Sequence, residues 1–130
     1  MLYTIIGIFI ILHGIIHGFY IGHSLKFFEL SPGMRWPIDS WILSRISNDK
    51  TIRFIASILL LVALAGFVLG GFALLLDLGW HQYIIFGSSF FSTFVYILFW
   101  NKTTKKLHDQ GGIGILINVL IFSVTYFVYQ

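Results

Sequence analysis

The chain has 130 residues, of which 58% are hydrophobic and only 10% are charged. A soluble domain carries roughly 25% charged residues, and a domain this small has a large surface for its volume. Eight basic and five acidic side chains cannot cover that surface. We therefore exclude a soluble globular protein and expect lipid to solvate much of the exterior. The absence of cysteine excludes disulfides, iron–sulfur clusters and thiolate zinc sites within this chain.

Four long apolar stretches cover approximately residues 2–22, 52–76, 80–100 and 111–129. Each is close to the roughly 20 residues that a helix needs to cross a bilayer core of about 30 Å. The first stretch has no basic residue before it and no small-residue cleavage site after it, so we interpret it as a span rather than a signal peptide. The sequence therefore predicts an all-α polytopic membrane protein, a single domain over residues 1–130 built as a four-helix transmembrane bundle.

Residues 24–51, which join the first two spans, mix aromatic, apolar and basic side chains. Tryptophan is enriched where a membrane meets water, so we expect this segment to lie along the interface as a structural anchor; a substrate gate is the alternative. Asp39 or Ser40 is expected to cap a short helix in this segment, and Asn48 or Asp49 to cap the second span.

The basic residues indicate how the chain is oriented. All of them fall around the first and third connections: Lys26, Arg35, Arg45, Lys50, Arg53, Lys102, Lys105 and Lys106. The positive-inside rule places both connections in the cytoplasm, which predicts a multi-pass protein of the cell (inner) membrane with both termini outside. The pI near 9.3 then reflects topology and attraction to anionic head groups. No nucleic-acid partner is predicted, because no basic and aromatic platform lies outside the membrane.

Two histidines within the first span are the most informative polar residues. His13 and His17 lie one helical turn apart, and Tyr20 continues the same stripe. Three glycines form the adjacent stripe: Gly14, Gly18 and Gly22. A row of small residues allows a neighbouring helix to approach closely. We therefore expect this side of the helix, with its histidines, to face the interior of the bundle.

Polar residues on the other spans lie at a similar depth, counted at about 1.5 Å per residue from the cytoplasmic ends. Asn118 and Ser57 fall near the level of His17, and Ser92, Thr93 and Tyr96 fall between His17 and His13. Ser89 shares a helix face with Ser92 and Tyr96. An unpaired polar group in a bilayer costs roughly 1 to 3 kcal/mol, so we expect one polar cluster. Its predicted ligand-binding residues are His13, His17, Tyr20, Ser92, Tyr96 and Asn118.

Three functions remain open for this cluster. It could bind a small molecule or lipid-soluble ligand, in a carrier or in a subunit of a larger complex or homo-oligomer. Alternatively, the histidines only pack and fix helix register in a structural or accessory protein, since such hydrogen bonds contribute around 0.6 kcal/mol apiece. The third function is a membrane oxidoreductase whose metal or haem is completed by oligomerisation. One chain offers only two adjacent histidines, which lack a third zinc ligand and cannot bind opposite faces of one haem iron. No catalytic residue and no cofactor is identified.

Short motifs spread over most of the chain carry a family resemblance. They are Leu12-His13-Gly14-Ile15-Ile16-His17, Asp39-Ser40-Trp41-Ile42-Leu43, Phe99-Trp100, and Gly114 with Asn118. The pattern resembles a family of small, uncharacterised four-helix prokaryotic membrane proteins, some of them labelled as transporter permeases. The resemblance implies a four-span fold and adds weight to His13, His17 and Asn118; it implies no activity.

Overall fold

The computed structural model describes residues 1–129 and contains four long helices. They are α1 (Leu2–Ser24), α2 (Asp49–Leu75), α3 (His81–Leu98) and α4 (Gly112–Val128). Single turns of 3-10 helix lie at Leu43–Arg45 and Leu107–Gln110, and residues 1–129 contain no β-strand. The all-α prediction is confirmed, and each helix begins and ends within three residues of the apolar stretch that predicts it.

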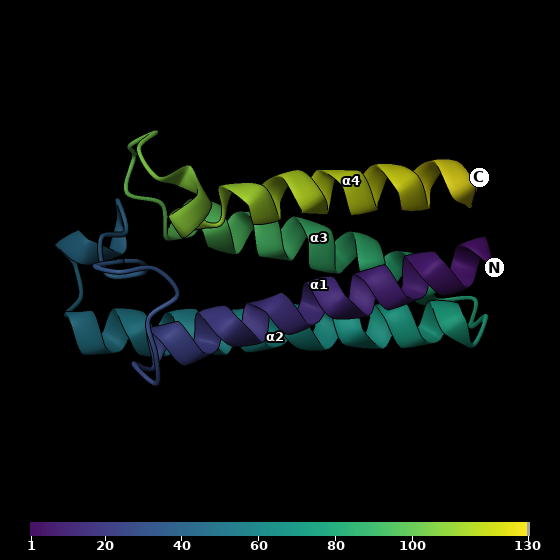
Figure 1. The fold of residues 1–130 in the computed structure, drawn as a ribbon, viewed down its shortest axis with the longest axis horizontal. Helices are drawn as coiled ribbons and strands as arrows, with labels where there is room; N and C mark the ends of the chain where they lie inside the picture. Colours follow the sequence, from purple (N-terminus) through teal and green to yellow (C-terminus); the bar gives the residue numbers. More distant parts are fainter. Residues whose placement is uncertain (130) are drawn as a thin grey trace.

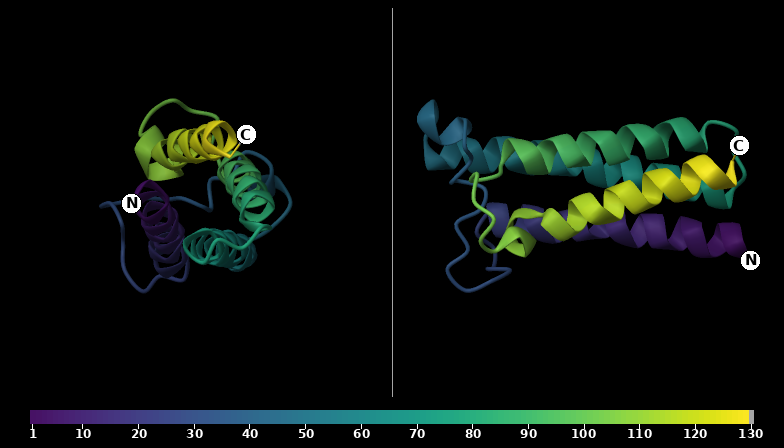
Figure 2. Two further views of the ribbon diagram at one scale, coloured as in Figure 1. Left: turned by 90° about the vertical axis from the view of Figure 1, so that its right-hand side faces the viewer. Right: turned by 90° about the horizontal axis from the view of Figure 1, so that it is seen from above.

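The four helices run alongside one another, with both termini at one end of the molecule and the two long connections at the other (Figure 1). An end-on view shows them arranged around a common centre in chain order (Figure 2, left). Consecutive helices pack against each other. The first and last helices are joined by side chains: the rings of Tyr3 and Tyr129 stack at 5.3 Å, and His13 bonds to Asn118.

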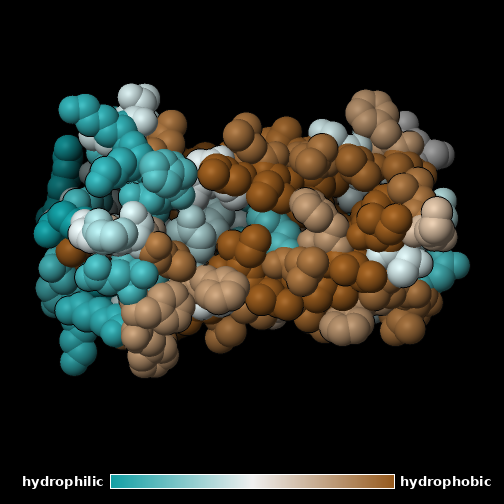
Figure 3. Space-filling view, in the orientation of Figure 1, coloured by the Kyte–Doolittle hydropathy of each residue, from teal (hydrophilic) through white to brown (hydrophobic). Residues whose placement is uncertain are grey.

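The surface separates into an apolar and a polar part. On the face that Figure 3 shows, most side chains over the helices are apolar, with a small hydrophilic patch near the middle, and hydrophilic side chains gather at the end with the two long connections. Large apolar side chains are exposed on every helix, among them Phe19, Leu61, Phe90 and Leu116. Two helices, α1 with 23 residues and α2 with 27, are long and apolar enough to cross a membrane.

Close packing of α1 against α2 depends on glycine. A Cβ atom added to Gly71 would lie 2.9 Å from the carbonyl oxygen of Gly7 and 2.6 Å from a side-chain carbon of Ile11. Gly14 and Gly18 face α2 in the same way, as their spacing predicts. Gly22, the last residue of that row, instead faces the ring of Phe28 in the following connection.

The connection between α1 and α2 folds back onto the end of the bundle instead of only lying along a surface. Trp36 is buried, and His23 donates a hydrogen bond from Nε2 to its carbonyl oxygen at 2.9 Å. The Ser40 hydroxyl donates to the Leu98 carbonyl at 2.6 Å, and the Trp41 indole donates to the Ile97 carbonyl at 3.0 Å. These bonds satisfy carbonyl groups in the last turn of α3.

One of the two predicted helix caps is found. The 3-10 turn begins after Ile42, which has no capping side chain, so the cap predicted at Asp39 or Ser40 is wrong. Ser40 Oγ accepts from the Leu43 amide at 3.2 Å, and Asp39 pairs with Arg35. The Asn48 side chain caps α2 by accepting from the Thr51 amide at 2.9 Å, so Asn48 rather than Asp49 has that role.

The glycine contact yields a prediction about stability. Alanine is intrinsically better than glycine in a helix by about 1 kcal/mol, yet Gly71→Ala should destabilise the protein by about 1 to 2 kcal/mol because the new methyl group overlaps α1. Gly87→Ala is the matched control, because nothing lies within 4 Å of a Cβ at that position. Thermal unfolding in detergent should show a lower Tm for Gly71→Ala and an unchanged or higher Tm for Gly87→Ala. Equal effects would contradict the α1–α2 packing.

Candidate functional site

Four buried polar side chains from three helices meet in the middle of the bundle: His13 and His17 on α1, Ser92 on α3 and Asn118 on α4. We call this set the polar layer. None of the four is more than 2% exposed. The sequence predicts that all four are neighbours, and the structure brings them together.

Hydrogen bonds join these four side chains in sequence. His13 Nε2 lies 2.7 Å from Asn118 Oδ1, Asn118 Nδ2 lies 3.0 Å from Ser92 Oγ, and Ser92 Oγ lies 2.7 Å from His17 Nε2. His17 Nδ1 lies 3.0 Å from the carbonyl oxygen of His13. The chain of bonds therefore starts and ends on His13, and links α1 to α3 and α4.

The direction of each bond follows from its partners. A carbonyl oxygen only accepts, so His17 Nδ1 carries the hydrogen and His17 Nε2 accepts from the Ser92 hydroxyl. The Asn118 amide nitrogen donates to Ser92, and its oxygen accepts from His13 Nε2. With both rings neutral, we assign opposite tautomers: hydrogen on Nδ1 in His17 and on Nε2 in His13.

The surroundings of the polar layer are apolar and uncharged. Residues 2–24, 81–98 and 112–128 contain no Asp, Glu, Lys or Arg. On the terminal side lies a core of buried apolar residues: Ile10, Phe67, Leu74, Ile85 and Ile121. On the connection side lies a second core: Trp36, Ile52, Ala56, Leu60, Val95, Tyr96 and Phe99. An ionised imidazole would have no countercharge there, which favours neutral rings.

The two predicted tyrosines lie beside the layer and make no hydrogen bond to it. The Tyr96 ring packs 5.7 Å from the His17 ring, and the Tyr20 ring packs 5.5 Å from the Tyr96 ring. The Tyr20 hydroxyl donates to the His108 carbonyl at 3.3 Å. Gly114 makes room for Tyr96, since a Cβ there would lie 2.9 Å from the tyrosine ring. Both tyrosines thus connect the polar layer to the polar end of the bundle.

A groove between α3 and α4 leads from the outer surface of the bundle to the polar layer. Its volume is about 160 Å³, and its lining consists of Ser89, Phe90, Thr93, Asn118, Val119 and Phe122. The Thr93 hydroxyl accepts from Asn118 Nδ2 at 3.1 Å and donates to the Ser89 carbonyl at 2.8 Å. Ser89 and Thr93 belong to this site but not to the predicted set, although the spacing of Ser89 from Ser92 and Tyr96 indicates a shared face.

Two polar atoms at this level keep unused hydrogen-bonding capacity. The Ser89 hydroxyl and His13 Nδ1 are buried and have no partner within residues 1–129. Buried polar groups are normally hydrogen-bonded, so each such atom calls for a partner. Ser57, which the depth count places near the layer, instead donates to the Arg53 carbonyl on its own helix at 2.8 Å.

The polar layer offers few ligands for a metal ion. Among residues 1–129, no three side chains of the metal-binding types His, Asp and Glu come together. Within one chain, the Nε2 atoms of both His13 and His17 are already used in hydrogen bonds.

Comparisons of the chain with protein-family models, with curated proteins and with solved structures found no match.

The hydrogen-bond chain predicts the effect of removing its central hydroxyl. Ser92→Ala leaves His17 Nε2 without its donor and one Asn118 N–H without its acceptor, so it should lower the free energy of unfolding by about 1 to 2 kcal/mol. Ser123→Ala is the control, because that hydroxyl bonds only to the Val119 carbonyl of its own helix. Reversible unfolding in mixed micelles would measure both. A loss no larger in Ser92→Ala than in Ser123→Ala would contradict the assigned bonds.

Proposed function

We propose that this chain is a four-span membrane protein that binds a small, lipid-soluble molecule in the groove between α3 and α4. The observation that carries the proposal is the groove itself, which is lined in part by Asn118 of the polar layer and by Ser89, whose hydroxyl is buried without a partner among residues 1–129. Binding there would provide that hydroxyl with the partner it lacks.

The four-span arrangement is supported by length, surface and charge. The 18 residues of α3 and 17 of α4 give helices of about 27 and 25 Å, close to a hydrocarbon core of about 30 Å. All basic side chains lie around the two connections at one end of the bundle. The positive-inside rule assigns that end to the cytoplasm and both termini to the outside of the cell membrane.

The groove defines the kind of ligand. The surface of the groove is almost entirely apolar, with Phe90, Val119 and Phe122 among its lining residues, and Ser89, Thr93 and Asn118 contribute only a small polar part. A cavity of about 150 Å³ is large enough for benzene, so the groove admits one small ring or a short branched chain. The ligand would therefore be a mostly apolar molecule with one hydrogen-bonding group, entering from the lipid. A carrier and a subunit of a larger complex could both use such a site.

Native mass spectrometry of the protein extracted gently from its own membrane tests this proposal. The wild type should retain an additional small mass. Ser89→Val, which fills the groove and removes the hydroxyl, should lose it, whereas Ser123→Val should keep it because that side chain lies outside the groove. A wild-type protein without any additional mass, or equal retention in Ser89→Val, would contradict ligand binding in the groove.

A second function is favoured by the closed hydrogen-bond chain. His17, Ser92 and Asn118 satisfy one another without any ligand, which is what a structural or accessory protein with register-fixing histidines requires. The same mass spectrum distinguishes the two functions. A bare wild-type protein combined with the stability loss expected for Ser92→Ala would favour the structural function.

The topology can be tested by labelling single introduced cysteines. Because the chain has no native cysteine, only the introduced thiol can react. Gly79→Cys, in the short connection after α2, should react with a membrane-impermeant thiol reagent added outside intact cells. Lys50→Cys, exposed at the start of α2, should react only after the membrane is opened. Labelling of both cysteines from the same side would contradict the arrangement, since α2 would then not cross the membrane.

A further inference from the structure

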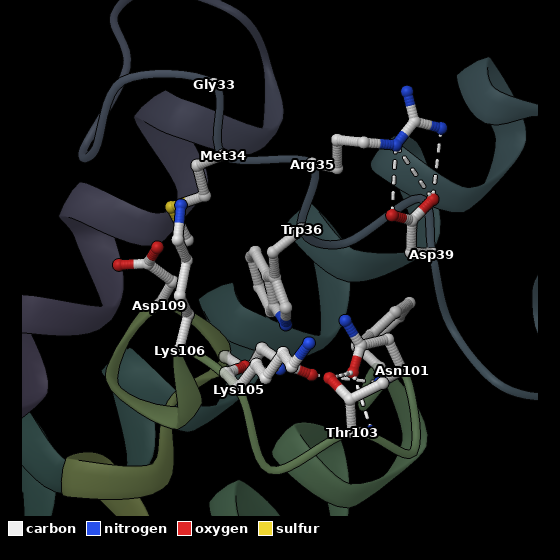
Figure 4. Close-up of a pocket in the computed structure, with 12 residues that line it drawn as sticks. Gly33, Met34, Arg35, Trp36, Asp39, Asn101, Thr103, Lys105, Lys106 and Asp109 are labelled. Carbon is white, nitrogen blue, oxygen red and sulfur yellow. Dashed lines mark hydrogen bonds and ion pairs between the residues drawn. The ribbon is translucent and has the colours of Figure 1, made fainter.

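A second pocket lies at the polar end of the bundle, away from the polar layer. Its volume is about 310 Å³, and it is formed where residues 33–39 of the first connection meet residues 99–110 (Figure 4). Five charged side chains line it, Arg35, Asp39, Lys105, Lys106 and Asp109, together with the Trp36 ring.

Trp36 gives this pocket a directed hydrogen-bond donor. The residue is 4% exposed, and its indole Nε1 is buried without a partner in the described part of the chain. An indole N–H can only donate, so the missing partner is an acceptor. Figure 4 shows the nitrogen end of the ring directed toward the side of the pocket formed by Asn101, Thr103 and Lys105.

The Trp36 ring is held firmly in this orientation. Its backbone carbonyl accepts a hydrogen bond from His23 at 2.9 Å, and its ring packs against the rings of Tyr20 and Phe99 at 5.1 and 5.8 Å. Tyr20 comes from α1 and Phe99 follows α3, so two parts of the bundle fix the indole. The donor is therefore in position before any ligand arrives.

The wall of the pocket formed by residues 101–110 is held by the buried side-chain amide of Gln110. Gln110 is 7% exposed; its oxygen accepts from the Asn101 amide at 2.9 Å, and its nitrogen donates to the Lys105 carbonyl at 3.1 Å. The Asn101 side chain accepts from the amide and the hydroxyl of Thr103 at 2.9 and 2.8 Å. These bonds hold the backbone that carries the two lysines at the pocket.

The charges of the pocket favour an anion. Arg35 forms a bidentate pair with Asp39 at 2.9 to 3.1 Å, and this carboxylate raises the pKa of the Arg35 guanidinium above its ordinary value, so the two charges compensate each other. Asp109 contacts His108 at 3.1 Å. Lys105 and Lys106 form no ion pair within residues 1–129. Three cationic and two acidic side chains therefore leave one net positive charge.

We propose that this pocket binds a phosphate group, with an oxygen accepting from the Trp36 indole N–H and with Lys105 and Lys106 as countercharges. Lysine is a common phosphate-binding residue, and a phosphate presents several acceptor oxygens to one donor and two cations. The group can come from the head group of an anionic phospholipid or from a free phosphate in solution. The lipid source rests on the proposed membrane topology, which places this end among the lipid head groups.

Binding is measured on the full chain in a non-ionic detergent, by native mass spectrometry and by the rise in Tm. The probes are short-chain phosphatidylglycerol and sodium phosphate, with sodium chloride at matched ionic strength. Phosphatidylglycerol should bind the wild type and raise its Tm. A rise with phosphatidylglycerol alone assigns the site to a lipid head group, and a rise with both probes assigns it to phosphate from either source. No binding of either probe would overturn the proposal.

Variants identify the residues that bind. Trp36→Phe keeps an aromatic ring and removes the donor, so it should weaken phosphatidylglycerol binding roughly tenfold. Lys105→Gln combined with Lys106→Gln should weaken it at least as much. Lys102→Gln is the control: it removes the same charge from the same connection, but its ammonium group lies over the Trp41 ring at 4.9 Å instead of in the pocket.

A purely structural role for Trp36 gives a different result. The Tm of Trp36→Phe without probe reports packing, and its shift with phosphatidylglycerol reports binding, so the two roles are separated even if the variant is less stable. Equal affinity of Trp36→Phe and the wild type would overturn the proposal, as would an equal loss in Lys102→Gln and in the paired lysine variant.

Discussion

The closed chain of hydrogen bonds through His13, Asn118, Ser92 and His17 is the constraint on which the arrangement of the helices depends. In the four-span arrangement proposed above, lipid tails would surround the helices. Because lipid tails are as apolar as leucine, the hydrophobic effect would supply little force between the helices, and close packing and polar contacts would take its place. Different contacts hold different helices in this bundle. Glycines allow α1 and α2 to pack closely, and the hydrogen bonds of the polar layer join α1 to α3 and α4. A change of helix register would separate these partners and leave buried polar groups unpaired.

The same hydrogen bonds leave two buried polar atoms without a partner. Once the four side chains have satisfied one another, the Ser89 hydroxyl and His13 Nδ1 still have no partner. Ser89 lines a groove with apolar walls, next to Asn118 of the polar layer, and in the proposed function a small molecule from the lipid occupies this groove. The proposed ligand-binding function and the structural function thus share one hydrogen-bond network. They differ in whether a ligand bonds to the unpartnered hydroxyl of Ser89. The phosphate pocket is independent of both, because Trp36 and its two lysines lie at the polar end of the bundle.

The sequence predicted the helices and all four residues of the polar layer, because helical periodicity and depth along the spans can both be counted in the sequence. Histidines one turn apart, beside a glycine row, indicate a buried face whatever surrounds it. Depth counting was less exact, since it assumes straight, untilted helices: Asn118 bonds to His13 although the count places it near His17, and Ser57 bonds within its own helix. The burial of Trp36 follows from no periodic pattern. It requires the first connection to fold back through bonds such as Ser40 to Leu98, which join residues far apart in the chain.

The tautomers of His13 and His17 test the hydrogen-bond chain most directly. In a protein labelled with ¹⁵N-histidine, with His23, His81 and His108 replaced, solid-state NMR in bilayers resolves the two remaining rings. We predict two neutral rings of opposite tautomer, with the hydrogen on Nδ1 in His17 and on Nε2 in His13. Two rings of the same tautomer, or a doubly protonated ring, would contradict the direction of the bonds through Ser92 and Asn118.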